Sequence, residues 1–195
     1  NFAIAQSRTH SMIWRLDKQT IKVYDRIIKE QLQKDFIEQV PNDNATEGHY
    51  IPHHYVNKDS PTTPIRIVYD CSCSTRNSPS LNDCLEQGTS LVNDLVPILI
   101  RFRTHRIAFT SDIEKAFLNI RLHESDRSFT KFFWLSDATN PESEFHTFRF
   151  KSVLFGATSS PFMLNAVVRK HLDNHPSEVT DNLRQNIYVD NLLTG

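Results

Sequence analysis

The spacing of apolar residues predicts two helices in the first half of the chain. In residues 17–39 apolar side chains recur at about 3.6-residue intervals, and charged residues fill the other face. Residues 91–102 show a similar spacing, with an expected bend at Pro97 because proline removes a helical hydrogen bond. The polar segment 41–48 between them predicts a loop.

Other stretches have the composition and alternation of strands. The β-branched run Ile65–Tyr69 predicts one strand, and the turn-forming segment 59–64 before it predicts a hairpin. The alternating stretch 106–111 predicts another strand. Aromatic-rich stretches at 128–135 and 144–151 predict two strands that pair with each other.

The last third of the chain predicts a helix and a hairpin. Ser160 as N-cap and Pro161 at the first helical position indicate a helix start. The expected buried stripe of this helix is Leu164, Val167, Val168, His171 and Leu172. Residues 186–195 (NIYVDNLLTG) predict a terminal hairpin. The order of strands and helices favours an α+β domain with an antiparallel sheet.

Composition excludes some classes of protein and leaves others open. The 195 residues are 38% hydrophobic and 23% charged with a net charge of −1, which is typical of a globular protein without an overall basic excess. No apolar run approaches the roughly 20 residues of a membrane span. Because the chain starts at Asn1 and stops soon after a turn, we expect either a segment of a longer polyprotein or a fragmentary gene product.

Cysteine usage favours a reducing compartment. The chain has three cysteines, an odd count with no CxxC pair, so neither a disulfide framework nor a zinc site is expected. Cys71 and Cys73 have the wrong spacing for zinc, even with His53 and His54 nearby in the sequence.

Two carboxylates occur where predicted strands end. Asp112 lies in the stretch TSDIEKAF, and Asp190 lies in YVDN. If the two strands are neighbours, both acids emerge at one edge of the sheet and need a cation between them. Oxygen ligands select a hard ion such as Mg²⁺, which also binds substrate phosphates. Taken singly, each aspartate is more simply a solvated turn or strand-end residue.

The stretches around these acids resemble the palm motifs of reverse transcriptases. TSDIEKAFLNI is similar to the first motif, FGATSSP to the second, and YVDN to the third, in which the family usually has YxDD. Further stretches resemble the Bel/Pao branch of LTR retrotransposons: YIPHHYV, IRIVYDCS, SLNDCLEQG and ILIRFRTH.

The resemblance implies an RNA-directed DNA polymerase domain of a retrotransposon Pol polyprotein. The expected fold is the right-hand polymerase fingers and palm, with the thumb absent. The expected segments are an N-terminal helical lead-in (1–48), a fingers-like region (49–105), and a palm with the catalytic motifs, truncated at the hairpin (106–195).

The resemblance also implies roles for residues near the predicted acids. Asp112 and Asp190 would be ligands of two Mg²⁺ (or Mn²⁺) ions that promote phosphoryl transfer to a primer. Phe117 would be a steric gate that rejects a 2′-hydroxyl, with a core aromatic as the alternative. Phe155 and Gly156 would help form the nucleotide pocket, although Gly156 is also explained by an ordinary turn.

Basic residues complete the implied site. Arg66, and with less support Lys58, would reach the triphosphate from the fingers hairpin, because guanidinium groups pair well with phosphate oxygens. Arg101, Arg103 and Arg106 would contact the template–primer backbone. As isolated residues, Arg66 and the three later arginines are more often solvated.

The implied partners and location follow from the same family. They are an RNA or DNA template with its primer, deoxynucleoside triphosphates and the other Pol domains, without a membrane. A cytoplasmic location, or one inside a virus-like particle, is expected.

Asn191 departs from the family pattern, which has a second aspartate there. An amide still offers an oxygen to a metal but removes one negative charge, so weaker ion binding is expected. The copy is either a working variant or a decaying, catalytically impaired remnant that retains nucleic-acid binding. We expect Asn191→Asp, with a thumb present, to raise primer extension. A palm polymerase that makes RNA is a further alternative, which the aromatic Phe117 disfavours.

Overall fold

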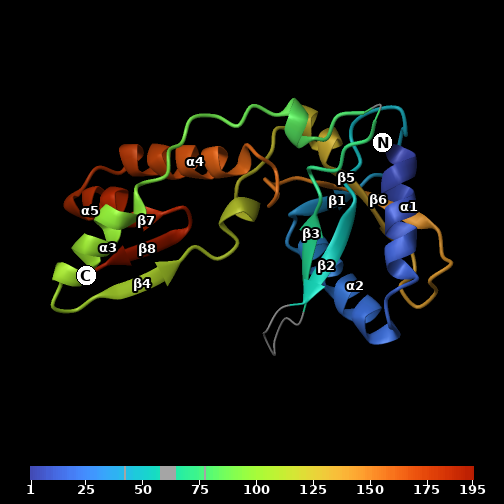
Figure 1. Ribbon diagram of the computed structural model, residues 1–195, viewed down its shortest axis with the longest axis horizontal. Helices are drawn as coiled ribbons and strands as arrows, with labels where there is room; N and C mark the ends of the chain where they lie inside the picture. Colours follow the sequence, from blue (N-terminus) through green and yellow to red (C-terminus); the bar gives the residue numbers. More distant parts are fainter. Residues whose placement is uncertain (42, 58–64, 77) are drawn as a thin grey trace. The chain divides into compact units, whose positions relative to one another are not determined.

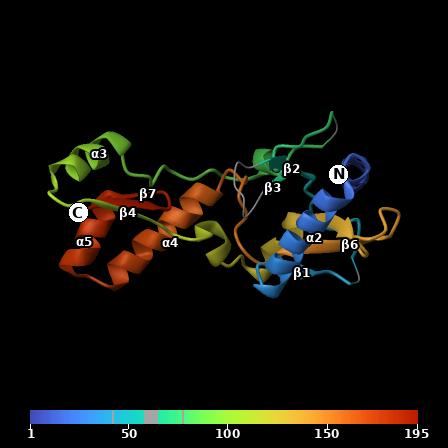
Figure 2. The same cartoon turned by 90° about the horizontal axis from the view of Figure 1, so that it is seen from below.

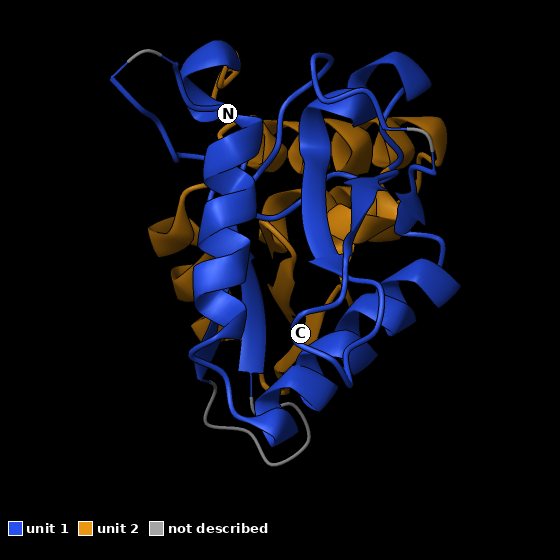
Figure 3. Cartoon of the chain, turned by 90° about the vertical axis from the view of Figure 1, so that its right-hand side faces the viewer, with its two compact units in different colours: residues 1–85, 121–157 blue, residues 86–120, 158–195 orange. Residues whose placement is uncertain are grey.

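The computed structural model describes residues 1–41, 43–57, 65–76 and 78–195, and it divides the chain into two compact units (Figures 1 and 3). Unit 1 comprises residues 1–85 and 121–157, and unit 2 comprises residues 86–120 and 158–195. Lys58 and the predicted turn at 59–64 lie outside the described residues. Each unit is described by itself.

Unit 1 contains a three-stranded antiparallel sheet and a separate hairpin. The sheet order is β1 (Ile37–Gln39), β6 (Phe145–Phe150), β5 (Lys131–Leu135), and the hairpin pairs β2 (His53–Asn57) with β3 (Ile65–Tyr69). β5 and β6 are antiparallel neighbours in a register that sets Phe133 opposite Thr147. The predicted pairing of the two aromatic-rich stretches and the predicted strand at residues 65–69 are therefore confirmed.

Two helices pack on the strands of unit 1. α1 (Phe2–Ile13) contacts β2 and β5, and α2 (Lys18–Gln33) contacts β1 and β3. Asp17 caps α2, since its carboxylate accepts hydrogen bonds from the backbone N–H groups of Gln19 and Thr20 at 2.8 and 2.9 Å. Short 3₁₀ helices complete the unit at Asn82–Cys84 (η1) and Glu124–Thr130 (η3).

The predicted helix over residues 17–39 is wrong at its C-terminal end. Asp35 adopts a left-handed backbone conformation with φ of 60°, which stops the helix. The next apolar residue, Ile37, pairs with Phe150 across the β1–β6 ladder and is buried. The burial offered by the sheet thus overrides the helical spacing.

Aromatic side chains form the core of unit 1. Trp134, which is 1% exposed, stacks on the ring of Tyr24 with centroids 4.4 Å apart, and its indole N–H donates to Asp25 at 3.1 Å. Phe132 packs edge-on against Tyr69 nearby. All five residues of β5 are buried, so this strand belongs to the core of the unit although it lies at an edge of its sheet.

Unit 2 is built around a three-stranded antiparallel sheet of order β4-β8-β7. Its strands are β4 (Phe109–Asp112), β7 (Ile187–Tyr188) and β8 (Asn191–Thr194). Its helices are α3 (Leu95–Thr104), the 3₁₀ helix η2 (Ala116–Asn119), α4 (Ser160–Asn174) and α5 (Glu178–Asn186). α3 and α5 contact β8, and α4 lies beside α5 (Figures 1 and 2). The predicted terminal hairpin is confirmed.

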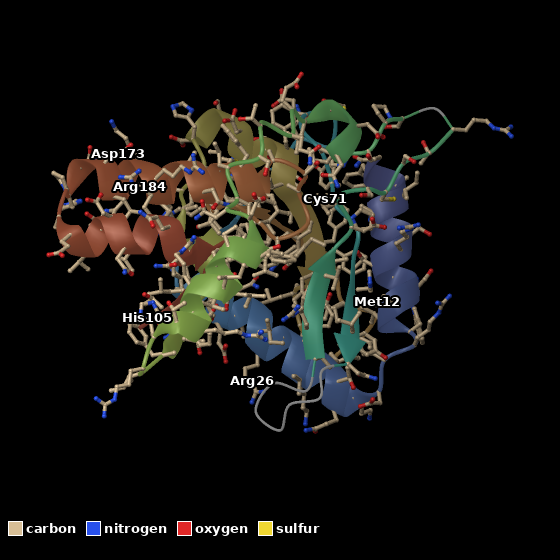
Figure 4. The ribbon with its side chains drawn as sticks, turned by 60° about the vertical axis from the view of Figure 1, so that its left-hand side comes forward. Met12, Arg26, Cys71, His105, Asp173 and Arg184 are labelled. Atoms are coloured by element: carbon tan, nitrogen blue, oxygen red, sulfur yellow. The ribbon has the colours of Figure 1, made fainter. Side chains whose placement is uncertain are left out.

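Three details of unit 2 differ from expectation. α3 begins at Leu95, so Pro97 lies in its first turn, where its missing N–H breaks no helical hydrogen bond. In α4, Leu164 and Leu172 are buried, but Val167 and His171 are exposed. α5 was not predicted. An ion pair between Asp173 and Arg184 at 2.8 Å joins it to α4 (Figure 4).

The segments expected from the resemblance are continuous stretches of the chain, whereas each compact unit is made of two separate stretches. Residues 121–157 belong to unit 1 together with the N-terminal part, and residues 86–105 belong to unit 2. The assignment of fingers and palm to the predicted segments stays a prediction. Among the described residues, no helix is both long and apolar enough to cross a membrane.

Candidate functional site

The predicted acids lie at one end of the unit 2 sheet. β4 and β8 pair in a register that sets Asp112 directly opposite Asn191. The backbone N–H of Ile113 donates to the carbonyl of Asp190 at 2.9 Å, which continues the contact beyond the last strand pair. Segments nearly 80 residues apart in the sequence thus bring Asp112, Asp190 and Asn191 to the same sheet edge.

A tight turn fixes the position of Asp190. Tyr188 pairs with Asn191, so the loop between β7 and β8 consists of Val189 and Asp190 only. Val189 has φ of 57°, as the first central residue of a type II′ turn does. A β-branched residue is disfavoured there, and such strain is often found at functional sites. The sequence gives little sign of it, since glycine is the usual residue at this position.

The side chain of Asn191 is hydrogen-bonded to the neighbouring acid. Its amide Nδ2 donates to Asp190 Oδ1 at 2.9 Å. Side chains of directly paired residues project on the same face, with Cβ atoms about 4.5–5.5 Å apart, so Asn191 is also within reach of Asp112. The amide therefore orients the Asp190 carboxylate and lies beside Asp112 across the strand pair.

This donor set fits a hard divalent cation only in part. Two carboxylates and one amide oxygen are suitable oxygen ligands; Asp112 and Asn191 are exposed, and Asp190 is partly exposed. In the part of the chain that the structure describes, no group of three His, Cys, Asp or Glu residues forms a metal cluster. An ion here would therefore need water or substrate oxygens to complete its shell, as Mg²⁺ ordinarily does.

A set of polar side chains, here named the polar clamp, holds the start of the hairpin. The Asn93 amide donates to the carbonyls of Arg184 and Ile187 at 2.8 and 2.9 Å. Arg101 donates from Nε to the buried Asn186 at 2.9 Å and from Nη2 to the carbonyl of Gln185. The sequence singles out Arg101 only for template contact, and it does not mark Asn93 or Asn186, because isolated asparagines carry no periodic signal.

The polar clamp gives Arg101 a structural role within unit 2. Its guanidinium is engaged by Asn186 and Gln185. Arg103, in the last turn of α3, and Arg106, in the segment before β4, are exposed. Template contact by the three arginines stays a prediction, and the exposed pair is better placed for it.

Phe117 lies on η2 shortly after Asp112. The ring is 8% exposed, and η2 packs against α4. A buried ring of this kind is compatible both with a core aromatic and with a gate that presents one edge to a bound sugar. The gate stays a prediction.

The remaining predicted residues belong to unit 1. Arg66 is exposed on β3, and Phe155 is 68% exposed. Gly156 has φ of 110°, and a Cβ there would approach the carbonyl of Tyr69 to 2.9 Å. This backbone position requires glycine for a structural reason. Lys58 lies outside the described residues.

Comparisons with known proteins show similarity at the level of the fold. No protein-family model matches the chain, and no curated protein matches it. Among solved structures, the chain is similar to a crystal structure of the protease–reverse transcriptase of prototype foamy virus, in a mutant form, with a TM-score of 0.64 and 17% sequence identity. The match covers 92% of this chain and 20% of that chain, so this chain spans about a fifth of its length.

The likeness defines a class of fold. The chain has a mixed α+β fold of the kind found within a retroviral protease–reverse transcriptase chain. At 17% identity, the comparison carries no statement about activity, substrate or metal.

Proposed function

We propose that this chain is part of the RNA-directed DNA polymerase of a retroelement, of the Bel/Pao type indicated by its sequence motifs. The observation that carries the proposal is the β4–β8 register, which sets Asp112 opposite Asn191 beside a two-residue turn that contains Asp190. Motifs that resemble reverse transcriptases thus supply the residues at one sheet edge, in a fold similar to a retroviral chain.

In the proposed reaction, a primer 3′-hydroxyl attacks the α-phosphate of a deoxynucleoside triphosphate in line, and pyrophosphate leaves. Asp112 and Asp190 would hold Mg²⁺ or Mn²⁺, which would neutralise charge on the phosphate oxygens. The Asn191 amide would orient the Asp190 carboxylate, as its 2.9 Å hydrogen bond does here. Positioning and charge neutralisation account for the catalysis, and no side chain acts as a covalent nucleophile.

The other assigned roles belong to the same proposal. Phe117 would exclude ribonucleotides, and Arg66, Phe155 and Gly156 would bind the nucleotide, with Lys58 as a contributor assigned from the sequence alone. Arg103 and Arg106 would contact the template–primer. A cytoplasmic or particle-enclosed location and association with other Pol domains accompany this function.

Single-nucleotide addition tests the proposal, because it requires no processive synthesis. With Mg²⁺ and the enzyme in excess over a poly(rA)/oligo(dT) substrate, the chain should transfer dTMP from dTTP to the primer and release pyrophosphate. Asp112→Asn should lower the rate by roughly a hundredfold or more, since charge stabilisation at the phosphate is usually the largest catalytic effect. Asp181→Asn, at an exposed position on α5, should leave the rate unchanged.

A second candidate function rests on Asn191 and the small number of acids at the sheet edge. It is a catalytically impaired remnant that still binds nucleic acid. Template–primer binding without nucleotide addition by the natural chain, together with addition by Asn191→Asp, would favour the remnant. Equal rates for the natural chain and the variant would show that the amide is adapted to the site.

A further inference from the structure

Unit 1 contains an open groove that the proposed polymerase function does not use. It has a volume of about 700 Å³ and lies between α1 and the loop that joins β5 to β6. These two segments lie side by side in Figure 1. We name it the α1 groove and define it by three aromatic residues, Phe2, Trp14 and Phe145, and two acidic residues, Glu142 and Glu144.

One wall of the α1 groove is an aromatic face of helix α1. Phe2, His10 and Trp14 recur at intervals of four or eight residues, so they share one side of the helix. The indole N–H of Trp14 donates to His10 Nε2 at 3.0 Å, which holds the ring although it is 57% exposed. Phe2 packs against Tyr50 and Phe133, so the exposed aromatic surface of this wall is mainly the Trp14 ring, which is held in place before any ligand arrives.

The opposite wall is a loop held by its own hydrogen bonds. The Asp137 carboxylate accepts from the Thr139 hydroxyl and backbone N–H at 2.7 and 2.8 Å, which lowers the pKa of Asp137. Asn140 accepts from the backbone N–H of Glu142 at 3.0 Å, and Ser136 donates to the carbonyl of Glu144 at 2.8 Å. The loop is thus ordered in a conformation that presents two glutamates.

The charge of the α1 groove is negative and largely unpaired. Neither Glu142 nor Glu144 forms an ion pair with any residue that the structure describes. The third acid of the lining, Asp43, is already paired with Lys131 at 2.5 Å. His10 is the only basic residue type in the described lining, and its Nε2 serves as an acceptor for Trp14.

This combination is complementary to a cationic, flat group. A guanidinium stacks on aromatic faces and pairs with carboxylates through a planar set of donors. A nucleic-acid strand would instead meet repulsion between its phosphates and the two glutamates. We propose that the α1 groove binds a basic peptide segment of a partner protein, whose arginine side chains lie over Trp14 and pair with Glu142 and Glu144.

Fluorescence anisotropy with a fluorescein-labelled peptide of alternating arginine and glycine tests this proposal on the whole chain. The double variant Glu142→Gln/Glu144→Gln should weaken peptide binding about tenfold, through loss of two partly exposed ion pairs. Trp14→Ala should weaken it about three- to fivefold through loss of the cation–π contact. Trp14→Phe should retain most of the peptide affinity that Trp14→Ala loses, because phenylalanine keeps an aromatic face.

A matched control separates the α1 groove from general attraction between charges. Glu86→Gln/Glu124→Gln removes the same charge at exposed positions outside the groove lining and should change affinity by less than about twofold. Equal weakening by both double variants, or no peptide binding by the natural chain, would overturn the proposal. Binding of a labelled RNA oligonucleotide that Trp14→Ala weakens would assign the groove to RNA instead. Circular dichroism of each variant checks that it remains folded.

Discussion

Two edge strands, β5 of unit 1 and β4 of unit 2, differ in what holds them. Every residue of β5 in unit 1 is buried, whereas every residue of β4 in unit 2 is exposed. β5 is fixed by aromatic packing around Trp134, while β4 is fixed by its register with β8. Hydrogen bonds are directional and so fix the position of a strand, but they contribute less net stability than the burial of large side chains. The strand that carries Asp112 is therefore well positioned and weakly anchored.

The largest expected effect is on the aromatic core of unit 1. Trp134→Ala should lower the free energy of unfolding by about 3–5 kcal/mol, because it leaves a cavity beside Tyr24 and removes the indole hydrogen bond to Asp25, which keeps its ion pair with Lys29. Phe109→Ala on β4, where the ring is 53% exposed, should cost less than about 1 kcal/mol. Urea unfolding followed by circular dichroism measures both. Equal losses would remove the contrast between the units.

Acid should weaken unit 1 through a buried histidine. Burial lowers the pKa of His53 to about 4, despite the opposing hydrogen bond to the Phe133 carbonyl at 2.7 Å. Tyr24 also hydrogen-bonds the His53 ring, at Nδ1. Because the unfolded chain takes up this proton near pH 6.5, the stabilisation is complete above that pH. It is lost as pH falls toward 4, by on the order of 3 kcal/mol.

The measurement is urea unfolding at a series of pH values between 4 and 7. His53→Gln keeps a donor and an acceptor without titrating, so it should flatten the profile in this range. An unchanged profile in His53→Gln would assign the acid sensitivity to other groups.

The polar clamp of unit 2 should be the next most sensitive feature. Asn186→Ala removes the acceptor for Arg101 and leaves a partly buried guanidinium without it, at a cost of about 1–3 kcal/mol. Hydrogen exchange of the β8 amides measures the effect within unit 2. Asn174→Ala, at the exposed end of α4, is the control and should cost little. No change in β8 protection in Asn186→Ala would show that the clamp does not hold the hairpin.

The smallest expected effect is a gain. Val189→Gly relieves a positive φ that costs an L-residue about 1–2 kcal/mol, and the flexibility of glycine offsets part of this. Protection of β8 should rise by about 0.5–1 kcal/mol. A loss of protection would show that packing of the valine side chain outweighs the backbone strain.

The same contrast explains what the sequence could predict. Strands β5 and β6 and the terminal hairpin were predicted, because aromatic-rich or apolar stretches on either side of polar turn residues are typical of buried, paired strands. α5 was not, since it has few apolar residues and depends on a capping box in which Ser177 and Thr180 bond each other's backbone N–H at 3.2 and 2.8 Å. β1 was mistaken for helix, because the left-handed turn at Asp35 leaves no mark in the apolar pattern.

For the site, motifs in the sequence singled out Asp112, Asp190 and Asn191, and the strand register sets Asp112 opposite Asn191, while their catalytic role stays a prediction. The polar clamp and the strained turn were not predictable. They depend on which backbone carbonyls lie near Asn93 and Arg101, which only the folded chain determines.

Manganese binding tests the central claim, that Asp112 and Asp190 together hold a divalent ion. Electron paramagnetic resonance counts free Mn²⁺ in the presence of the chain. The account predicts that the chain binds Mn²⁺ and that Asp112→Asn weakens this binding at least about tenfold. Even the loss of a residue that only hydrogen-bonds a metal ligand typically weakens metal binding by that much. Asp181→Asn should leave the Mn²⁺ affinity unchanged. Equal Mn²⁺ affinity of the natural chain and Asp112→Asn would contradict the account.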